Sequence, residues 1–421
     1  MAYAASYVDS DLVGLEYCEE ATISAATALY TPASATKGPL YAKDITAEVS
    51  AHMIDVAPQK PQMNRGPNAS IVGAKGGKIG FKLPLRGGQI AAGTRGTSPI
   101  YSLGKYSGFT RKSITASANN SIVTGGTSST VTMLDADAAQ YEVGDFILVN
   151  CNEAVSGVLQ LRYITKMVAN AGTTTISVHP NFATNPTSLD STFSLDILTP
   201  AATNAGQIID GSTNKFFGFK YYKGYGALNR SMLWGLGGAG TFKFDAVKAG
   251  EIPYASFEYM VDSWSSSAAA DMTTSADAFY TPPLWVSDDF YIGEVAVDVE
   301  EFSFDPGHQL VPIAGQGPNG RHSWFYKDMK PKLSFKPYWD EQYVTDWLAG
   351  TQSQVFIQRV ASNSNAWGIC IPSVQFEKVK HGAVSGGMLG ADLDIRITDP
   401  GSNDEVSPAQ FPLFSICFTG A

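Results

Sequence analysis

Charged residues are scarce in this 421-residue chain. Asp, Glu, Lys and Arg together make up 16% of it, against about a quarter in ordinary globular proteins. The net charge is −10, and no run of Lys or Arg occurs. The closest approach to a basic cluster is Lys75, Lys78, Lys82 and Arg86, whose spacing along a strand-like segment favours a solvated face. The shortage argues against a general nucleic-acid binder, which needs a basic stripe.

Cysteine and long apolar runs are scarce too. The four cysteines lie far apart without CxxC spacing, which is typical of small buried hydrophobes in a reducing compartment: Cys18, Cys151, Cys370 and Cys417. The first residues lack a basic region followed by an apolar one, so we expect no signal peptide. No apolar run approaches the roughly 20 residues that span a bilayer. We therefore expect a protein made in a cytoplasm, without membrane insertion.

Metal-ligand spacings are also missing. The five histidines are isolated from one another: His52, His179, His308, His322 and His381. His308 and His322 flank a Gly/Pro loop, but no carboxylate or cysteine stands at ligand spacing from them. Asp392, Asp394 and Asp399 lack the spacing of a calcium loop. The sequence predicts no metal site.

Residue patterns of catalysis are equally rare. The acidic pairs at 288–289 and 300–301 fall where a strand would send neighbours to opposite faces, which favours solvated carboxylates over an acid/base pair. The glycines at 235–240 precede a strand, whereas phosphate-binding loops precede a helix. The sequence therefore predicts no catalytic residue and no cofactor, and so a protein that is not an enzyme.

Glycine and strand-like alternation are what the chain has in abundance. It holds 41 glycines and long Ser, Thr and Ala tracts, which strand-and-turn proteins use. The clearest alternation runs from 241 to 262. Its apolar side is Phe242, Phe244, Ala246, Phe257, Tyr259 and Val261, and its wet side is Thr241, Lys243, Asp245, Ser256, Glu258 and Asp262. Two such runs joined by a Gly/Pro bend predict an antiparallel pair with one buried and one polar face.

The last half of the chain is a succession of short strands. We predict them at 295–299, 301–304, 332–336, 355–360, 367–371, 374–379, 393–397 and 414–418. One helix is predicted at 339–348, where Tyr343, Trp347 and Leu348 share a face and Gly350 ends it. These elements predict a mainly β protein, an antiparallel β-sandwich or barrel with a flanking helix.

The chain divides into three parts on composition. Residues 1–112 form an irregular arm, with a possible helix at 42–56, followed by the first sheet strands near 77–87. Residues 113–200 form an inserted, exposed small β module with strands at 146–149, 158–168 and 174–178. Residues 201–421 form the sandwich. The segments 77–87 and 240–250 share a glycine frame, which raises the possibility of a duplicated β unit.

The order of motifs resembles that of tail tube proteins of long-tailed bacteriophages. The matching stretches span most of the chain: GGKIGFKLPLRG at 76–87, the Gly144-Asp145 module, MLWGLGGAGTFKF at 232–244, AGEIP at 249–253, PPL at 282–284 and PKLSF at 331–335. The resemblance implies a sandwich whose sheets join those of neighbouring copies around a channel, with stacked rings forming the tube that delivers the genome. It implies trimeric or hexameric rings, contacts with tape measure and tail terminator proteins, and a place in the virion tail after assembly in the host cytoplasm.

On this interpretation the 241–261 hairpin lines the channel. An acidic surface repels DNA phosphates, so the genome would pass without specific binding. The candidates for the lining are Asp245, Glu258, Asp392 and Asp394, although the same carboxylates would also serve to keep an outer surface soluble. Two other classes remain open: another virion structural protein, such as a major capsid or baseplate component, and an adhesive or carbohydrate-active β protein.

Overall fold

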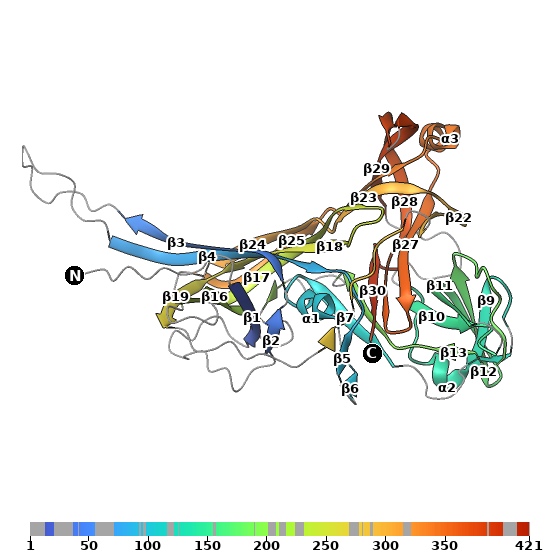
Figure 1. The fold of residues 1–421 in the computed structure, drawn as a ribbon, viewed down its shortest axis with the longest axis horizontal. Helices are drawn as coiled ribbons and strands as arrows, with labels where there is room; N and C mark the ends of the chain where they lie inside the picture. The colour runs from blue at the N-terminus through green and yellow to red at the C-terminus, as the bar shows by residue number, and fades with distance from the viewer. Residues whose placement is uncertain are drawn as a thin grey trace, which may run out of the picture.

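The computed structural model has a mainly antiparallel β fold, as the sequence predicts (Figure 1). The residues it describes are 13–20, 37–40, 42–54, 71–91, 94–95, 98–115, 122–124, 126–154, 157–188, 190–200, 208–209, 216–223, 231–268, 278–279, 281–286, 289–314, 321–384, 387–398 and 411–420.

A long curved sheet dominates the molecule, and we call it the front sheet. Its eight strands are neighbours in the order β3 (Lys43–Ile54), β4 (Ile71–Pro84), β18 (Tyr254–Val261), β17 (Ser231–Lys248), β23 (Val299–Asp305), β26 (Lys332–Pro337), β29 (Leu389–Ile397) and β28 (Asn365–Ala383). It runs from the left end of Figure 1 to the raised tip at the upper right.

Two back sheets pack behind the front sheet. The first holds β2 (Lys37–Leu40), β1 (Val13–Glu20), β16 (Phe216–Lys223), the start of β17 and β19 (Ser263–Ala268). The second holds β7 (Phe109–Ile114), β14 (Leu195–Pro200), β30 (Ser415–Thr419), the start of β28, β27 (Ser353–Ser362), β21 (Phe290–Ile292) and β22 (Val295–Ala296). Side chains of the front sheet and of both back sheets share one core.

The chain builds the same arrangement twice. The first repeat is β3, β4, α1 (Pro99–Gly104), β16, β17, β18 and β19, and the second is β23, β26, α3 (Glu341–Ala349), β27, β28, β29 and β30. In each repeat the first two strands pair, the strand before last lies between the second strand and the long strand, and the long strand continues into the back sheet. The repeats meet where β17 pairs with β23.

A duplicated unit is therefore present, but the segments 77–87 and 240–250 are not its copies. Both belong to the first repeat, where β4 and β17 flank β18. The counterpart of β4 is β26, since each is the second strand of its repeat and each ends at a proline, Pro84 or Pro337.

The predicted hairpin at 241–261 is confirmed. Phe242 lies opposite Phe257 across β17 and β18, and Gly250 in the bend has a φ of +83°, which glycine adopts without strain. Two side assignments are wrong. The pairing of β17 with β23 shifts register between Phe244 and Val247, so Val247 is buried in place of Ala246. Asp262 is buried as well, where the chain leaves the front sheet.

The helix at 339–348 is confirmed as α3. The side chain of Asp340 accepts a hydrogen bond from the backbone N–H of Gln342 at 2.9 Å, and Gly350 takes a left-handed conformation at the end. The helix predicted at 42–56 is wrong. That segment is strand β3, and its apolar residues recur at every second position, which suits pairing with β4.

Within the part predicted as an irregular arm, the described segments 13–20 and 37–40 are strands β1 and β2 of the first back sheet. The strands predicted at 367–371 and 374–379 are one strand, β28. Pro372 lies where its pairing with β27 shifts register, a position at which a strand tolerates proline.

A separate sheet, which we call the module sheet, lies within residues 113–200. Its strands are neighbours in the order β13 (Ser191–Thr192), β10 (Phe146–Cys151), β11 (Val158–Asn170), β12 (Thr173–His179), β9 (Thr130–Leu134) and β8 (Ile122–Thr124), with α2 (Asp135–Ala138) beside them. The predicted strands at 146–149, 158–168 and 174–178 are confirmed. Its core continues into the second back sheet through Phe356, Cys370 and Cys417.

Two small sheets complete the described chain. β24 (His308–Ala314) and β25 (Arg321–Met329) form a hairpin that β15 (Ile208–Ile209) extends. β5 (Gln89–Ala91) pairs with β6 (Thr94–Arg95) and with β20 (Ala278–Phe279).

Candidate functional site

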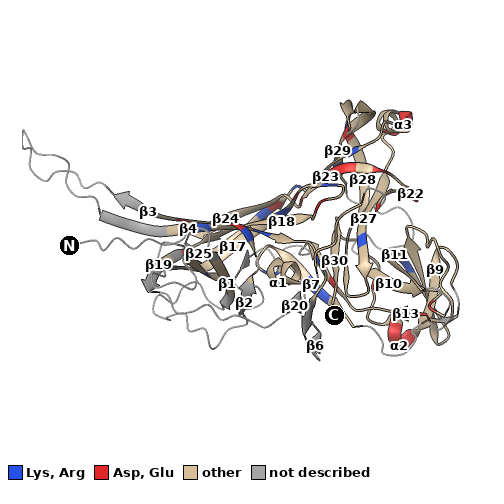
Figure 2. Cartoon of the chain, viewed as in Figure 1, with Lys and Arg blue, Asp and Glu red and all other residues tan. Residues whose placement is uncertain are grey.

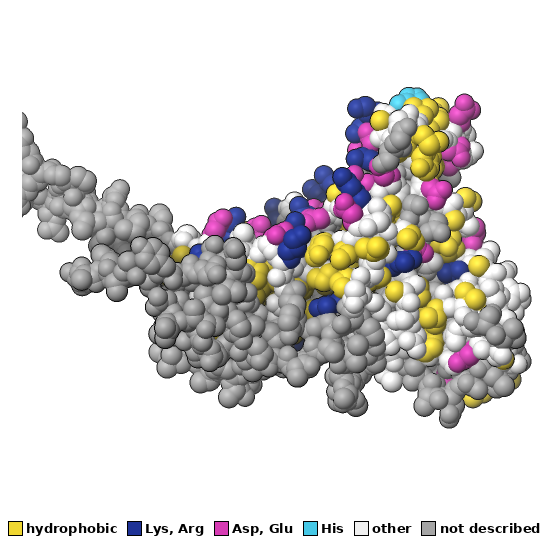
Figure 3. Space-filling model, in the orientation of Figure 1, with side chains coloured by type: hydrophobic (Ala, Val, Ile, Leu, Met, Phe, Trp, Pro, Cys, Tyr) yellow, Lys and Arg dark blue, Asp and Glu magenta, His cyan; other side chains and the backbone are white. Residues whose placement is uncertain are grey.

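The solvent-facing side of the front sheet is the most distinctive surface of the molecule, and we call it the charged face. Lys, Arg, Asp and Glu residues recur along the front sheet from strand to strand (Figure 2). In the space-filling view they line the hollowed upper contour (Figure 3). The strict alternation of the strands explains this band, because every second side chain points away from the core.

An aromatic layer supports the charged face from inside. Phe242 packs against Phe257 with ring centroids 5.1 Å apart, and Phe257 stacks on Phe81 at 5.3 Å. Gly240 lets these strands approach, because a Cβ there would meet the carbonyl oxygen of Glu258 at 2.3 Å. Each buried aromatic side chain contributes about 1.5–3 kcal/mol, so the curvature of the charged face is fixed by the packing beneath it.

Ion pairs connect the strands of the first repeat, either between neighbours or across one intervening strand. Lys82 Nζ lies 3.1 Å from Asp245 Oδ2 and 3.6 Å from Asp44 Oδ2, and Lys78 Nζ lies 3.5 Å from Glu48 Oε2. The hydrogen bond and charge of Asp245, with a further contribution from Asp44, raise the pKa of Lys82. Asp245 also accepts a hydrogen bond from Ser256 Oγ.

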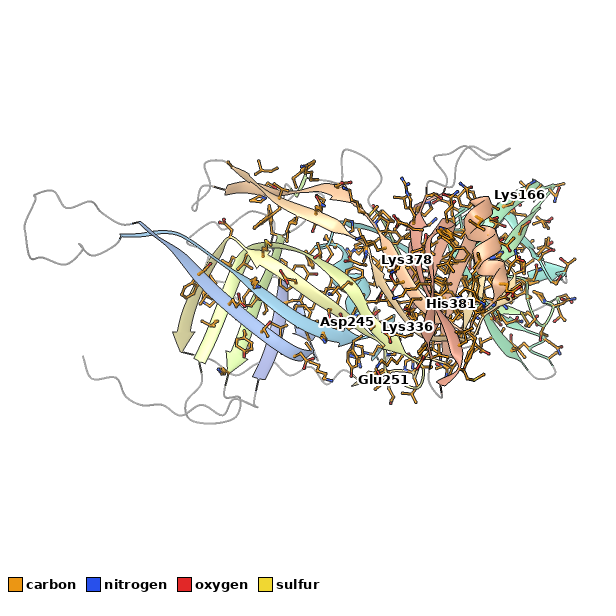
Figure 4. All side chains as sticks on the ribbon, turned by 90° about the horizontal axis from the view of Figure 1, so that it is seen from above. Lys166, Asp245, Glu251, Lys336, Lys378 and His381 are labelled. Carbon is orange, nitrogen blue, oxygen red and sulfur yellow. The ribbon has the colours of Figure 1, made fainter. Side chains whose placement is uncertain are left out.

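The second repeat carries a corresponding set. Lys336 Nζ lies 3.3 Å from Glu301 Oε2, and Lys378 Nζ lies 3.2 Å from Asp394 Oδ2. The hydroxyl of Ser334 donates to Asp394 Oδ1 at 2.7 Å, and this hydrogen bond, helped by the charge of Lys378, lowers the pKa of Asp394. Figure 4 looks down on this face and shows Asp245, Lys336 and Lys378 spread across it.

The four carboxylates predicted for a channel lining all lie on the front sheet. Glu258 is exposed on β18, Asp245 lies on β17, and Asp392 and Asp394 lie on β29. Basic side chains stand among them on neighbouring strands, so this face carries both signs of charge where the sequence predicts a predominantly acidic surface. The strand register accounts for the mixture: Lys378 lies opposite Asp394 and Lys380 opposite Asp392.

The residues considered for metal binding lie apart. Within the part of the chain that the structure describes, no group of three or more His, Cys, Asp or Glu residues is arranged to hold an ion. His308 lies between the rings of Phe109 and Tyr326, at 4.8 and 5.5 Å, and burial lowers its pKa to about 4. His381 stacks on Trp339 at 3.7 Å. The side chain of His322 and the whole of Asp399 lie outside the described residues.

The described residues of the 288–289 pair and the described cysteines lie in an ion pair or in the core. Asp289 lies 3.1 Å from Arg359 Nη1, and Asp288 is outside the described residues. The described free thiols are all buried: Cys151, Cys370 and Cys417. Burial raises the pKa of Cys151 to about 12, so its thiol stays protonated at neutral pH. These cysteines act as small core side chains, as their spacing predicts.

The sequence missed a polar junction between the module sheet and the second back sheet. Arg162 is almost fully buried, and it donates to Gln160 Oε1 at 2.9 Å and to the carbonyl oxygen of Leu161 at 2.7 Å. Desolvation lowers its pKa. Glu294 accepts a hydrogen bond from the backbone N–H of Asn181 at 2.7 Å and contacts His179 Nδ1 at the same distance. These residues lie far apart along the chain, and no local pattern connects them.

No protein-family model matches this sequence, and comparison with curated proteins finds no similar chain. None of the helices in the described ranges is long and apolar enough to cross a membrane.

Proposed function

We propose that this protein is a structural subunit of a bacteriophage tail tube, and that the charged face of its front sheet lines the channel for the genome. The observation that supports the proposal is the front sheet itself. It is a continuous, curved, eight-stranded antiparallel wall with one aromatic side and one polar side. A conduit for a polyanion needs a continuous wall that is polar on the channel side and supported by a packed core on the other side.

The paired charges suit passage of DNA without retention. Tight binding requires unpaired Lys and Arg that neutralise phosphates and release counterions. Here Lys82, Lys336 and Lys378 each have a carboxylate partner within 3.3 Å. A phosphate would have to compete with that partner, so its gain on binding is small.

On this proposal the protein self-associates into trimeric or hexameric rings that stack as the virion tail tube. Tape measure and tail terminator proteins are its expected partners, and assembly takes place in the host cytoplasm. The alternative is another virion component, such as a major capsid or baseplate protein.

Imaging of the purified chain by negative-stain electron microscopy tests the proposal. We expect discs or tubes with a central hole, and light scattering should show a mass well above one chain. Closed icosahedral shells would favour a capsid protein instead. A species that remains monomeric at high protein concentration would contradict a tube subunit.

Binding of duplex DNA to the assembled rings tests the lining. We expect weak binding even at low salt, because Lys82, Lys336 and Lys378 of the charged face already have carboxylate partners. Tight binding that falls steeply with added salt would show that the charges face outward or exchange partners.

A further inference from the structure

The module sheet, at the right of Figure 1, is joined to the rest of the chain by two adjacent strands. β7 leads into it and β14 leads out of it, and β7 pairs with β14 along its whole length. At this end Lys112 Nζ on β7 lies 2.7 Å from Oδ2 of the buried Asp145. We call the paired strands β7 and β14 the hinge, because a module that comes away elsewhere stays attached through them.

A second polar contact holds the module sheet from another element. Glu294 lies in the turn between β21 and β22 of the second back sheet, and its carboxylate reaches the end of β12. Oε2 accepts a hydrogen bond from the backbone N–H of Asn181 at 2.7 Å, and Oε1 lies 2.7 Å from Nδ1 of His179. We call these three residues the latch.

The latch accommodates the neutral form of the His179 ring. Because Nδ1 faces a carboxylate oxygen, it carries the proton, and Nε2 is the unprotonated nitrogen. This Nε2 atom is buried, and none of the described residues makes a hydrogen bond to it. A second proton would therefore create a buried N–H group without an acceptor, which costs free energy.

The groups around His179 oppose its protonation on balance. Desolvation is the largest effect and lowers the pKa of His179, the buried Arg162 on β11 lowers it further, and Glu294 with a backbone contact from its turn raises it. Tyr163, directly opposite on β11, is uncharged because burial holds its pKa well above the usual value. The segment before β9, which bonds to the backbone of β12, has only uncharged residues at 127–129.

We propose that the latch is sensitive to acid: it holds the module sheet on the second back sheet near neutral pH and opens in acid, so that the module turns on the hinge while the front sheet stays folded. The latch belongs to the single chain and does not depend on ring assembly.

The direction of the pH effect follows from the two states of the latch. Once the latch opens, His179 is solvated and its pKa returns to the ordinary value of about 6.5. The open state therefore takes up the proton first. The contribution of His179 to the closed state is complete above about pH 6.5 and is lost as the pH falls towards the lowered pKa of the closed latch.

The hinge responds to acid in the opposite direction. Burial raises the pKa of Asp145, although Lys112 acts against this change. The folded hinge therefore takes up this proton more readily than the unfolded chain does, and the contribution of Asp145 to stability improves as the pH falls. Acid weakens one end of the module contact and spares the other, which favours local opening at the latch.

Two native cysteines report on the opening. The thiols of Cys370 and Cys417 are buried where the core of the module sheet meets the second back sheet. A dipyridyl disulfide labels thiols in acid as well as at neutral pH, and peptide mass spectrometry follows each site. After correction for the pH dependence of the reagent, labelling of the wild type should be severalfold faster at about pH 5 than at about pH 7.5, with an unchanged circular dichroism spectrum.

Three variants assign the effect to the latch. His179→Gln cannot take up the proton, so it should label slowly at both pH values. The matched control is His308→Gln, which removes the buried histidine of the β24–β25 hairpin and should keep the acid-dependent labelling of the wild type. Glu294→Ala removes the latch without changing the histidine, so at neutral pH it should label about as fast as the wild type does in acid.

Several outcomes would overturn the latch. They are labelling of the wild type that does not depend on pH, acid-dependent labelling that persists in His179→Gln, and slow labelling of Glu294→Ala at neutral pH. Loss of the circular dichroism signal in step with labelling would show that the whole chain unfolds, and would overturn the turning of the module on the hinge. None of these outcomes bears on the tube function, which imaging of the assembled protein tests separately.

Discussion

The two repeats differ mainly in what is inserted into them and where. In the first repeat, the module sheet lies between α1 and β16, whereas in the second only residues 350–352 separate α3 from β27. The second repeat instead inserts the β24–β25 hairpin between its first two strands.

Each insertion packs on the other repeat. The module sheet shares its core with β27, β28 and β30 of the second repeat. In the β24–β25 hairpin, Trp324 Nε1 donates to the carbonyl oxygen of Gly237 at 2.7 Å, and the Tyr326 hydroxyl donates to those of Tyr106 and Gly240 at 2.8 and 2.9 Å. The front sheet keeps the same strand order in both repeats. Each insertion packs on the other repeat, and so the two insertions hold the repeats together.

Removing the module sheet should have the largest effect on stability, because this insertion packs on the second repeat. The sequence alone suggests that a Gly/Ser linker in place of residues 113–200 leaves assembly intact. The structure leads us to expect the reverse. The linker would leave Phe356, Cys370 and Cys417 uncovered and would remove β14, which pairs with β30. A loss comparable with the total stability of a domain, about 5–15 kcal/mol, should appear as failure to recover soluble, folded protein.

A Gly-Ser insertion after Gly172 is the control for the linker replacement. This turn has a φ of +91° and no atom within 4 Å of a would-be Cβ, so it should accept the insertion. Recovery of a cooperatively folded chain without the module sheet would show that the second repeat is stable on its own.

Truncation at the contact between repeats should have the next largest effect. The ring of Phe244 in β17 stacks on Phe304 of β23 with centroids 6.0 Å apart, and both are buried. Phe244→Ala should lower the free energy of unfolding by about 3–5 kcal/mol, measured by denaturant titration.

Two further variants sharpen that measurement. Glu258→Gln, on the exposed side of the neighbouring strand, should change stability by less than about 0.5 kcal/mol. A double-mutant cycle of Phe244→Ala with Phe304→Ala should show coupling between the repeats. Equal destabilisation by Phe244→Ala and Glu258→Gln would contradict the assignment of faces.

Acidification should reveal how the β24–β25 hairpin packs on the first repeat. Burial between Phe109 and Tyr326 lowers the pKa of His308 to about 4, below its usual value near 6.5. The unfolded chain takes up this proton first, so the stabilising contribution is complete above pH 6.5 and is lost as the pH falls towards 4. We expect about 1–3 kcal/mol from this group.

His308→Gln should flatten the stability profile between pH 6.5 and 4. Denaturant titrations of both proteins at several pH values measure the difference. Parallel profiles for the wild type and the variant would place the acid sensitivity elsewhere.

Removing single ion pairs of the charged face should have the smallest effect. Lys82→Met removes the pairs with Asp245 and Asp44 in the first repeat, and Lys336→Met removes the pair with Glu301 in the second. Each partly exposed pair contributes about 0–1 kcal/mol. The two losses should be similar and should shrink in high salt, as thermal unfolding at two salt concentrations would show. A loss of several kcal/mol in only one repeat would mean that its pair is part of a larger network.

Local pattern predicted most of the strand faces, with Ala246 and Asp262 as exceptions. Phe242, Phe257, Leu393 and Ile395 are buried as their alternation predicts, and Gly350 ends α3 because it adopts a left-handed conformation at little cost. The mainly β fold follows from the same signals.

The sequence did not reveal which strands pair when they lie far apart along the chain. The glycine frames at 77–87 and 240–250 look alike, yet both strands lie beside β18, and only the pairing order reveals that β26 is the counterpart of β4. The balance of the charged face was missed for the same reason. Net charge counts Asp245 and Lys82 separately, whereas their strands bring them within 3.1 Å.

The long strands β17 and β28 each belong to a front and a back sheet at once. Residues 231–238 of β17 pair in the back sheet and residues 239–248 in the front sheet, and the two layers share one core, so we expect opening of one layer to destabilise the other. Native-state hydrogen exchange should then show both layers opening together, as one cooperative unit. In the stacked assembly that we propose, the same continuity would transmit a displacement of the front sheet to the back sheets.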